Sequence, residues 1–513
     1  MEDRRAEDEV IYFLMPDRFA NGNPANDRGG LSGGPRRTGY DPTHKGFYHG
    51  GDLKGVLDHL DYIAALGATA IWVTPIFANK PVQGADPWVS AGYHGYWITD
   101  FTRVDPHLGT NADFKALVEA AHARGIKVYM DIVTNHTADV IAYRECLGKD
   151  ACPYRPLGTP AYTPVVPEAE ARIKVPAWLN DPALYHNRGN STFRGESSLY
   201  GDFSGLDDLD TENRRVIEGM IAIYKDWITK YRVDGFRIDT ARHVSDVFWR
   251  RFLPAILDHA KALGIPDFYI FGEVAHPEPG YLARYVRALG MPAALDFPFA
   301  YTVQSVLVGG AATARLAALF AADDLYTAPG RGAARLPVFN GNHDMGRLGH
   351  FLLQGLGKDA PDALLRRRME MGYALLFFAR GVPVIYYGDE QGFTGDGGDQ
   401  DAREDMFESD VAIYNDNRLI GTTATTASGN FDPGHPLFQS LAAMARVYHA
   451  ERGLRRGVQI VRHFADTPGL FALSRIDREA GREYLFVLNT ADGERSAAVP
   501  VATADGPWRR LIG

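Results

Sequence analysis

The sequence has few cysteines and lacks a long apolar run. Cys146 and Cys152 are the only two cysteines among 513 residues. No further cysteine and no cluster of histidines lies near them, which argues against a zinc site. Their spacing fits a short-loop disulfide, although two free thiols are nearly as well supported. No segment approaches the roughly 18 consecutive apolar residues of a membrane-spanning helix, so we expect no membrane partner.

Positive charge is not in excess either. The formal net charge is −10 at pH 7 and the pI is about 5.9. An acidic protein does not attract a polyanion, so we expect no nucleic-acid partner. The amino terminus, MEDRRAEDEV, is charged and lacks the apolar core of a signal peptide. Two locations stay open: the cytoplasm or, as we favour, a secreted or periplasmic site reached with a signal that this chain does not carry.

One unit repeats along the chain: a short β-rich run, a loop and an amphipathic helix. Helical patterns at 51–67 and 111–125 each end on a glycine, a common helix stop. Eight alternating units predict a closed (β/α)8 TIM barrel, an α/β fold. The β-rich runs lie at 10–19, 69–75, 126–133, 233–239, 268–274, 293–297, 336–344 and 382–390, of which the sixth has the weakest pattern.

Two segments fall outside this repeat. The third run ends at 133 and the next helical pattern begins at 211, a far longer connection than usual. We therefore expect an inserted domain B after strand 3. The last helical pattern is followed by alternating segments that predict a short C-terminal antiparallel β domain, either native in length or truncated. The predicted bounds are 1–137 and 206–457 for the barrel, 138–205 for domain B and 458–513 for the C-terminal domain.

Charged side chains stand where several of these strands end. In VDGFRIDTARH, Arg237 and Asp239 are two apart and project from the same side of a strand. Taken alone, a structural ion pair is an equally good explanation. However, Glu273 ends the fifth run and Asp344 ends the seventh, and the strand ends of a barrel converge on one mouth. Three converging carboxylates indicate glycoside hydrolysis, in which one carboxylate attacks and another protonates the leaving oxygen.

The neighbours of these carboxylates predict their ionisation. Arg237 favours the charged form of Asp239, as a nucleophile requires. Crowding by two further carboxylates raises the pKa of Glu273, as a proton donor requires. Asp344 then supplies negative charge and hydrogen bonds to sugar hydroxyls.

The segments DIVTNH, GFRIDTARH, FGEV and FNGNHD resemble, in order and spacing, the signature regions of the α-amylase family, glycoside hydrolase family 13. LDDLD (206–210) and GVPVIYYGDE (381–390) resemble two further regions, and the similarity extends from about 10 to 460. The resemblance implies a retaining mechanism with Asp239 as nucleophile, Glu273 as acid/base and Asp344 as transition-state stabiliser. It also implies that the sugar before the cleaved bond is held by Arg237, His94, Tyr96, His136 and His343, with Tyr96 stacking on its ring.

Further residues could line the binding subsites for other sugar units. Trp97 is a candidate for stacking against sugar, and Trp88, Trp178 and Tyr185 are weaker ones. Arg242 and His243 stand where many amylases have Lys-His, which bears on the leaving-group side because arginine and lysine are not interchangeable. The acidic segment 395–410 could bind another cation or substrate hydroxyls, but we interpret it as a solvated loop, the commoner case.

Two calcium sites follow from the resemblance. The loop NGNPAND resembles the calcium loop of cyclodextrin glucanotransferases, although its composition alone favours an ordinary turn. Side-chain oxygens at this spacing suit Ca²⁺. The ligands implied for calcium 1 are Asn21, Asn23, Asn26, Asp27, the Gly50 carbonyl and Asp52, and those for calcium 2 are Asn135, Asp208 and His243.

LDDLD is closest to the version found in α-amylases, and no N-terminal β domain precedes the first strand. Both points predict a monomeric hydrolase that cleaves internal α-1,4 bonds of starch and maltooligosaccharides. The alternatives are a maltogenic amylase, neopullulanase, cyclomaltodextrinase or α-glucan transglycosylase. A non-catalytic binding or assembly subunit is a remote reading, because such proteins usually lose one of the three carboxylates.

Overall fold

The computed structural model describes residues 4–149, 152–502 and 506–513. Its main sheet has eight parallel strands in the order β12-β11-β10-β7-β2-β1-β14-β13. The two end strands meet where the Asp296 N–H donates to the Pro337 carbonyl at 2.9 Å, so the sheet closes into a barrel. The eight predicted strands are confirmed. They are β1 (Ile11–Leu14), β2 (Ala70–Val73), β7 (Lys127–Ile132), β10 (Gly235–Ile238), β11 (Tyr269–Gly272), β12 (Ala293–Ala294), β13 (Pro337–Val338) and β14 (Val382–Tyr386).

Strand residues are buried on both faces, as expected of a parallel sheet covered by helices. Inside the barrel, Phe13 stacks on Trp72 with ring centroids 3.7 Å apart, and Phe271 meets Trp72 edge-on. This packed interior positions the strand ends that carry the charged residues. The longer helices around it are α5 (Asn111–Ala123), α7 (Arg214–Tyr231), α8 (Asp246–Ala262), α9 (Pro279–Arg287), α10 (Phe297–Leu307), α11 (Ala314–Ala321), α12 (Leu348–Leu356), α13 (Asp362–Phe378) and α15 (Pro436–Ala450).

The single helix predicted over 51–67 is two helices, α3 (Leu53–Asp58) and α4 (Leu60–Ala65). The His59 imidazole bonds the Gly55 carbonyl at 2.8 Å, the group that a continuous helix would offer to the His59 N–H. The His59 N–H donates instead to Val56, and the ring stacks on Phe431. The remaining helices are short: α1 (Pro16–Phe19), α2 (Pro35–Thr38), α6 (Ser197–Tyr200), α14 (Ala412–Asn415) and α16 (Arg452–Arg456).

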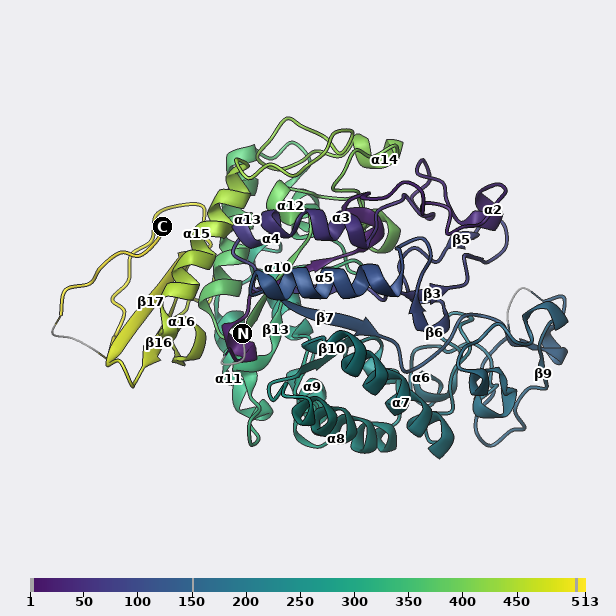
Figure 1. Cartoon of the computed structure of the whole chain (residues 1–513). Coiled ribbons are helices and arrows are strands. Elements are labelled where there is room, and N and C mark those ends of the chain that lie inside the picture. The colour runs from purple at the N-terminus through teal and green to yellow at the C-terminus, as the bar shows by residue number, and fades with distance from the viewer. Residues whose placement is uncertain (1–3, 150–151, 503–505) are drawn as a thin grey trace.

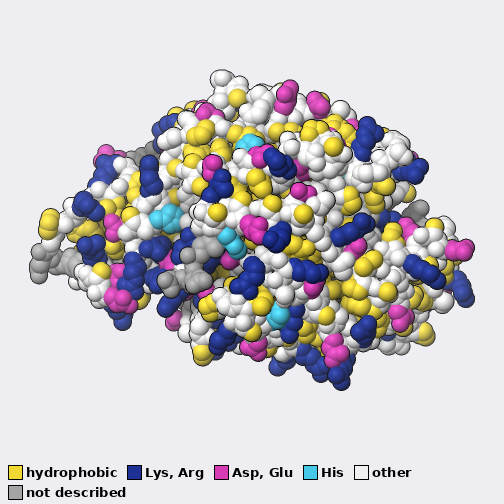
Figure 2. Space-filling view, in the orientation of Figure 1, with side chains coloured by type: hydrophobic (Ala, Val, Ile, Leu, Met, Phe, Trp, Pro, Cys, Tyr) yellow, Lys and Arg dark blue, Asp and Glu magenta, His cyan; other side chains and the backbone are white. Residues whose placement is uncertain are grey.

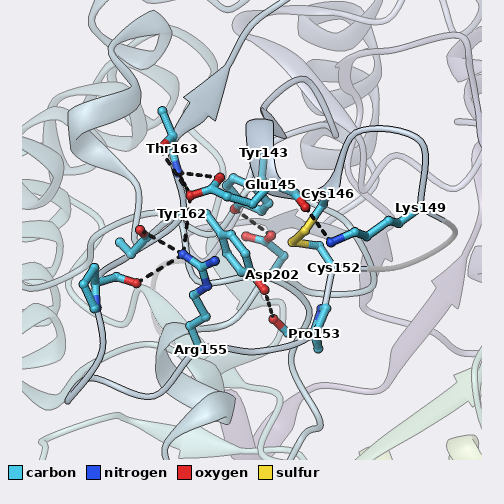
Figure 3. Close-up of a disulfide and its surroundings, with 12 residues drawn as sticks. Tyr143, Glu145, Cys146, Lys149, Cys152, Pro153, Arg155, Tyr162, Thr163 and Asp202 are labelled. Atoms are coloured by element: carbon cyan, nitrogen blue, oxygen red, sulfur yellow. Dashed lines mark hydrogen bonds and ion pairs between the residues drawn. A yellow bond between two sulfur atoms is a disulfide. The ribbon is translucent and has the colours of Figure 1, made fainter.

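Between β7 and α7 the described chain is largely irregular, with two short strands, β8 (Ala142–Tyr143) and β9 (Pro164–Val165). Cys146 and Cys152 form a disulfide here, with 2.02 Å between the sulfur atoms, which settles the choice left open by the sequence (Figure 3). β7 points toward the end of the barrel where this segment lies, beside β3 (Phe77–Asn79) and β6 (Ile98–Val104) (Figure 1). The exact bounds predicted for the domains remain a prediction.

The predicted antiparallel β domain is confirmed as a three-stranded sheet, β15 (Val458–His463), β16 (Leu470–Asp477) and β17 (Arg482–Asn489). It lies at the end of the barrel away from the strand carboxyl ends (Figure 1). Basic and acidic side chains are interspersed on the face shown in Figure 2. Among the described helices, none combines the length and apolar character that a membrane crossing needs.

Candidate active site

Arg237 is the centre of the charged cluster at the barrel mouth. It lies opposite Asp131 on the paired strands β10 and β7, and its Nη1 is 2.8 Å from Asp131 Oδ1. The same guanidinium is 2.9 Å from Asp239 Oδ1 and 2.9 Å from Glu273 Oε2. These four side chains are at most 12% exposed. Arg237 therefore brings two of the predicted catalytic carboxylates, from adjacent strands, to a single group.

Backbone contacts fix both carboxylates. The Asp239 N–H donates to the Ile132 carbonyl, which continues the β10–β7 ladder by one residue. Glu273 follows β11, and its Oε2 accepts a 3.0 Å hydrogen bond from the Thr240 N–H. Thr240 adopts φ +44°, a left-handed conformation that is costly for a β-branched residue. The chain thus turns sharply between the two strands and aims an N–H at the acid.

Asp344 belongs to the same cluster through a chain of polar contacts. Its Oδ2 is 3.4 Å from His343 Nε2, which lies 2.9 Å from the Tyr96 hydroxyl. That hydroxyl in turn accepts from Arg237 at 3.3 Å. The Asp344 N–H donates to the Asn342 side chain, and its carboxylate is 47% exposed, so it is accessible from solvent.

The pKa of Glu273 is raised to about 7, first by burial and then by Asp239 and Asp344, while Arg237 opposes the rise. The predicted direction is confirmed, but burial is a larger cause than the crowding that the sequence indicated. A carboxyl with this pKa can hold a proton near neutral pH. Burial also raises the pKa of Asp131 to about 7 against the effect of Arg237.

The pKa values of Asp239 and Asp344 are shifted in opposite directions. Burial raises the pKa of Asp239, and Arg237 lowers it without cancelling that rise. For Asp344, enclosure raises the pKa, but His343, Arg403 and Arg237 together hold it below its ordinary value. The two arginines carry the charge at neutral pH. Arg237 thus acts on Asp239 in the predicted sense, and burial outweighs it.

The predicted sugar-binding rings lie around this cluster. Tyr96 is near-parallel to both His343 and His94, with ring centroids 5.7 and 5.6 Å apart. Burial lowers the pKa of His343 to about 3 and that of His136 to about 4, so both are neutral hydrogen-bonding groups. Trp97 is half-buried, with its ring 4.7 Å from that of His94.

Arg242 lies beside the acid: its Nη1 donates to the Ala275 carbonyl at 2.6 Å, two residues after Glu273. The His243 imidazole is hydrogen-bonded to the Ser198 carbonyl at 2.7 Å. Its ring is therefore engaged with the inserted segment and not with the cleft. Of the weaker aromatic candidates, Tyr185 is buried and Trp178 packs on helix α7 near Arg215, whereas Trp88 is exposed.

The interpretation of 395–410 as a solvated loop is wrong for residues 402–406, which are buried. Arg403 Nη2 is 3.0 Å from Asp344 Oδ1, and Arg403 Nε donates to the His343 carbonyl. Glu404 pairs with the buried Arg347 at 2.7 Å. Arg403 is thus a site residue that the sequence reasoning missed. The available signal was an arginine among acidic residues directly after the eighth strand.

The loop NGNPAND and the segment around Gly50 come together as predicted. Asn21 Nδ2 donates to Asp27 Oδ1 at 2.9 Å, and Asn26 Nδ2 donates to Asp52 Oδ2 at 3.2 Å. Gly50 has φ +98°, and a Cβ there would lie 2.7 Å from Asn21 Nδ2. Within the described residues, Asn21 Oδ1 and Asn26 Oδ1 are buried without a hydrogen-bond partner. The side chain of Asn23 is exposed, and the backbone N–H of Asn23 donates to Asp52.

The second predicted calcium set is partly assembled. Asn135 Oδ1 is buried and, among the residues described, has no hydrogen-bond partner. Asp208 is buried, with Oδ2 2.6 Å from His186 Nδ1. The Nδ1 of His243 bonds the Ser198 carbonyl, so this ring nitrogen is not free to bind an ion. A cation here would therefore rely on carbonyl and carboxylate oxygens, the ligands that Ca²⁺ prefers.

Residues 13–456 match the family model described as the α-amylase catalytic domain. The chain belongs to the α-amylase family. An α-amylase of Streptomyces lividans is 47% identical over 531 residues, covering 98% of this chain and 58% of the relative. The chain thus spans little more than half of that relative's length.

Two solved structures are similar along nearly the whole chain. An Anoxybacillus α-amylase has a TM-score of 0.69 at 30% identity, covering 93% of this chain and 86% of its own. CldA, a cyclomaltodextrin glucanotransferase with a three-domain ABC distribution, has a TM-score of 0.72 at 27% identity, covering 94% and 87%.

Proposed function

We propose that this α-amylase-family protein is a retaining α-glucan hydrolase that cleaves internal α-1,4 bonds of starch-like polysaccharides and maltooligosaccharides. The observation that carries the proposal is the position of Arg237, 2.9 Å from both Asp239 and Glu273. An ionisable nucleophile and a proton-holding acid on neighbouring strands are what the retaining mechanism requires.

In the first step the Asp239 carboxylate attacks the anomeric carbon while Glu273 protonates the departing glycosidic oxygen. A covalent glycosyl-enzyme forms and the leaving-group side of the glucan departs. In the second step the ionised Glu273 accepts a proton from water, which attacks the same carbon and releases Asp239. Asp344, kept ionised by its arginine neighbours, stabilises the positive charge that develops on the sugar.

We further propose that the loop with Asn21, Asn26, Asp27, Gly50 and Asp52 holds Ca²⁺. The two buried side-chain oxygens without partners fit such a cation, because burying an unpaired acceptor is costly. Bound there, the ion would tie the loop to the segment that leads into α3. Asn23 would contribute little, since its side chain is exposed. A second ion at Asn135 and Asp208, with the His243 carbonyl, would join the inserted segment to the barrel.

The disulfide supports an oxidising compartment as the place of action, because disulfides rarely persist in the cytosol. Mass spectrometry of protein purified under alkylating conditions tests this, since free thiols at Cys146 and Cys152 would contradict it. We also propose a monomer, which light scattering would check.

The product profile on soluble starch, pullulan and γ-cyclodextrin tests the main proposal, with Glu273→Gln as the inactive control. Rapid loss of starch viscosity with mixed maltooligosaccharides, and little action on the other two glucans, is expected. Maltose or panose released preferentially from pullulan or cyclodextrin would instead identify a maltogenic or neopullulanase-type enzyme.

Transglycosylation is the second candidate, because the cyclomaltodextrin glucanotransferase CldA is similar along 94% of this chain. Both reactions share the glycosyl-enzyme and differ in whether water or a sugar hydroxyl attacks it. Formation of cyclodextrins from starch would establish this second activity.

A further inference from the structure

Arg18 lies beyond the carboxyl end of the first strand of the barrel, and its side chain is fully buried. It belongs to α1, the short helix that follows β1. Burying a guanidinium is costly unless its N–H groups find acceptors. The acceptors of Arg18 therefore show which parts of the barrel mouth it holds together.

Most of these acceptors are backbone carbonyls from two separate segments. Nη1 donates to the Phe47 carbonyl at 2.9 Å, and Nη2 donates to the Lys45 carbonyl at 2.8 Å. Nε donates to the Arg403 carbonyl at 3.1 Å. Nη1 also bonds the carboxylate of the adjacent Asp17. Arg18 thus ties the segment 45–47 to the loop that carries Arg403.

Tyr93, which follows β5 (Ser90–Ala91), gives Arg18 a second connection to Arg403. The Arg18 guanidinium lies over the Tyr93 ring, with Cζ 3.8 Å from the ring centroid. A cation in this position is attracted to the face of the ring. The hydroxyl of the same ring accepts a hydrogen bond from Arg403 Nη1 at 3.1 Å. Arg403 is therefore held at its carbonyl by Arg18 and at its guanidinium by Tyr93.

The other two nitrogens of the Arg403 guanidinium face the catalytic cluster. Nε donates to the His343 carbonyl at 3.0 Å, and Nη2 is 3.0 Å from Asp344 Oδ1. A guanidinium is planar and rigid, so fixing Nη1 restricts the direction of Nε and Nη2 as well. This restriction matters because the Asp344 carboxylate is half-exposed and needs a fixed partner to keep its direction.

We infer that Arg18 and Tyr93 are positioning residues that aim Arg403 at Asp344. The inference rests on the proposed function, in which Asp344 stabilises the positive charge that develops on the sugar. Both residues act through Arg403 and not on the sugar itself. A displacement of about 1 Å in a catalytic group can cost about a hundredfold in rate, so contacts that prevent it affect turnover as well as stability.

The test uses two conservative variants, Arg18→Lys and Tyr93→Phe. Lysine keeps the charge but lacks the planar fork, and phenylalanine keeps the ring but lacks the hydroxyl. We expect each variant to lower kcat on a soluble maltooligosaccharide about tenfold and to change KM less than about twofold, because a group that acts on the developing charge affects kcat. Arg380→Lys is the matched control, since Arg380 is also buried and pairs with Asp296 and Asp323. It should lower the melting temperature and leave kcat unchanged.

Double variants separate positioning from a general loss of stability. In an Arg403→Leu background, Arg18→Lys and Tyr93→Phe should cause no further loss of kcat, because their effects pass through Arg403. Losses that multiply in the double variants would overturn the inference, and so would an equal loss of kcat in Arg380→Lys. Unchanged kcat in either folded single variant would overturn it for that residue. Should Arg18→Lys not fold, Tyr93→Phe carries the same comparison, since it removes one hydroxyl only.

Acarbose binding, measured by calorimetry in a Glu273→Gln background, separates the inference from the proposed function because it needs no turnover. The amine of acarbose is protonated at neutral pH, so its affinity depends on the placement of Asp344. We expect Arg18→Lys and Tyr93→Phe to bind acarbose about tenfold more weakly and to bind the neutral maltotetraose unchanged. Weaker acarbose binding in both variants, with no hydrolysis by the parent protein, would keep the positioning role and refute the hydrolase. Unchanged acarbose affinity would overturn the positioning role and leave the hydrolase assignment intact.

Discussion

Replacing Arg237 by methionine separates a catalytic role of this residue from a merely structural one. The guanidinium forms ion pairs with Asp131, Asp239 and Glu273 at 2.8–2.9 Å, and none of these side chains is more than 12% exposed. Methionine roughly preserves the length of the side chain and removes its charge. Three buried carboxylates then lose a shared counter-charge.

The magnitude follows from that sharing. Removing one partner of a buried ion pair costs about 3–5 kcal/mol. Divided among three carboxylates, this is about 1–1.7 kcal/mol each, or about one pKa unit, since one unit corresponds to about 1.4 kcal/mol. Arg237 lowers the pKa of both Asp239 and Glu273, so both rise when it is lost. Activity needs Asp239 ionised and Glu273 protonated, so both limbs of the bell-shaped profile move to higher pH.

The assay is kcat/KM on a soluble maltooligosaccharide from pH 4 to pH 9, with urea unfolding in parallel. We expect the whole bell to shift by about one pH unit toward alkali, with a lower maximum. The control is Arg347→Met, which removes an equally buried arginine paired with Asp389 and Glu404. It should destabilise the fold and leave the bell in place. An unshifted bell in Arg237→Met, or equal shifts in both variants, would refute the reasoning.

Three further perturbations test the rest of the site. Arg403→Leu should lower kcat by at least tenfold and most strongly at acid pH, because Arg403 holds Asp344 and lowers its pKa; pH-dependent kinetics that match the wild type would contradict this. Chelation with EDTA should lower the melting temperature by several degrees, since a cation present at 100 times its Kd stabilises the fold by about 2.7 kcal/mol. Differential scanning fluorimetry should show that the melting temperature recovers with Ca²⁺ and not with Mg²⁺. An unchanged melting temperature after chelation would rule out both calcium sites. Reduction of the disulfide, which closes a loop of sequence separation 6, should cost about 2 kcal/mol of unfolding free energy by the chain-entropy relation, measured by urea unfolding; stability equal to that of the oxidised protein would show that the bond constrains nothing.

The barrel could be predicted from the sequence because its strands are short apolar runs separated by helical periodicity, and both signals are local. The break at His59 could not, because it depends on a ring–carbonyl contact and on stacking against Phe431, far along the chain. Local periodicity describes only which face of a helix is apolar. It does not record that a histidine ring bonds a carbonyl of its own helix or stacks on a distant phenylalanine.

The same distinction holds in the site. Arg237, Asp239 and Glu273 could be brought together from the sequence, because parallel strand ends must converge in a barrel. Arg403 could not, since the path of a long loop is set by what it buries, and composition alone suggested a solvated segment. The balance between burial and Arg237 at Asp239 likewise required the structure.

The closure of the barrel between β12 and β13 bears on how the molecule opens. Each of these strands has two residues, and the described backbone bond between them runs from Asp296 to Pro337. By contrast, β1 pairs with β2 over four residues. Local opening starts where few backbone bonds hold, so amide hydrogens near this seam should exchange earliest of the barrel. Hydrogen-exchange mass spectrometry would then show the barrel opening first at this seam, before the other strand pairs exchange.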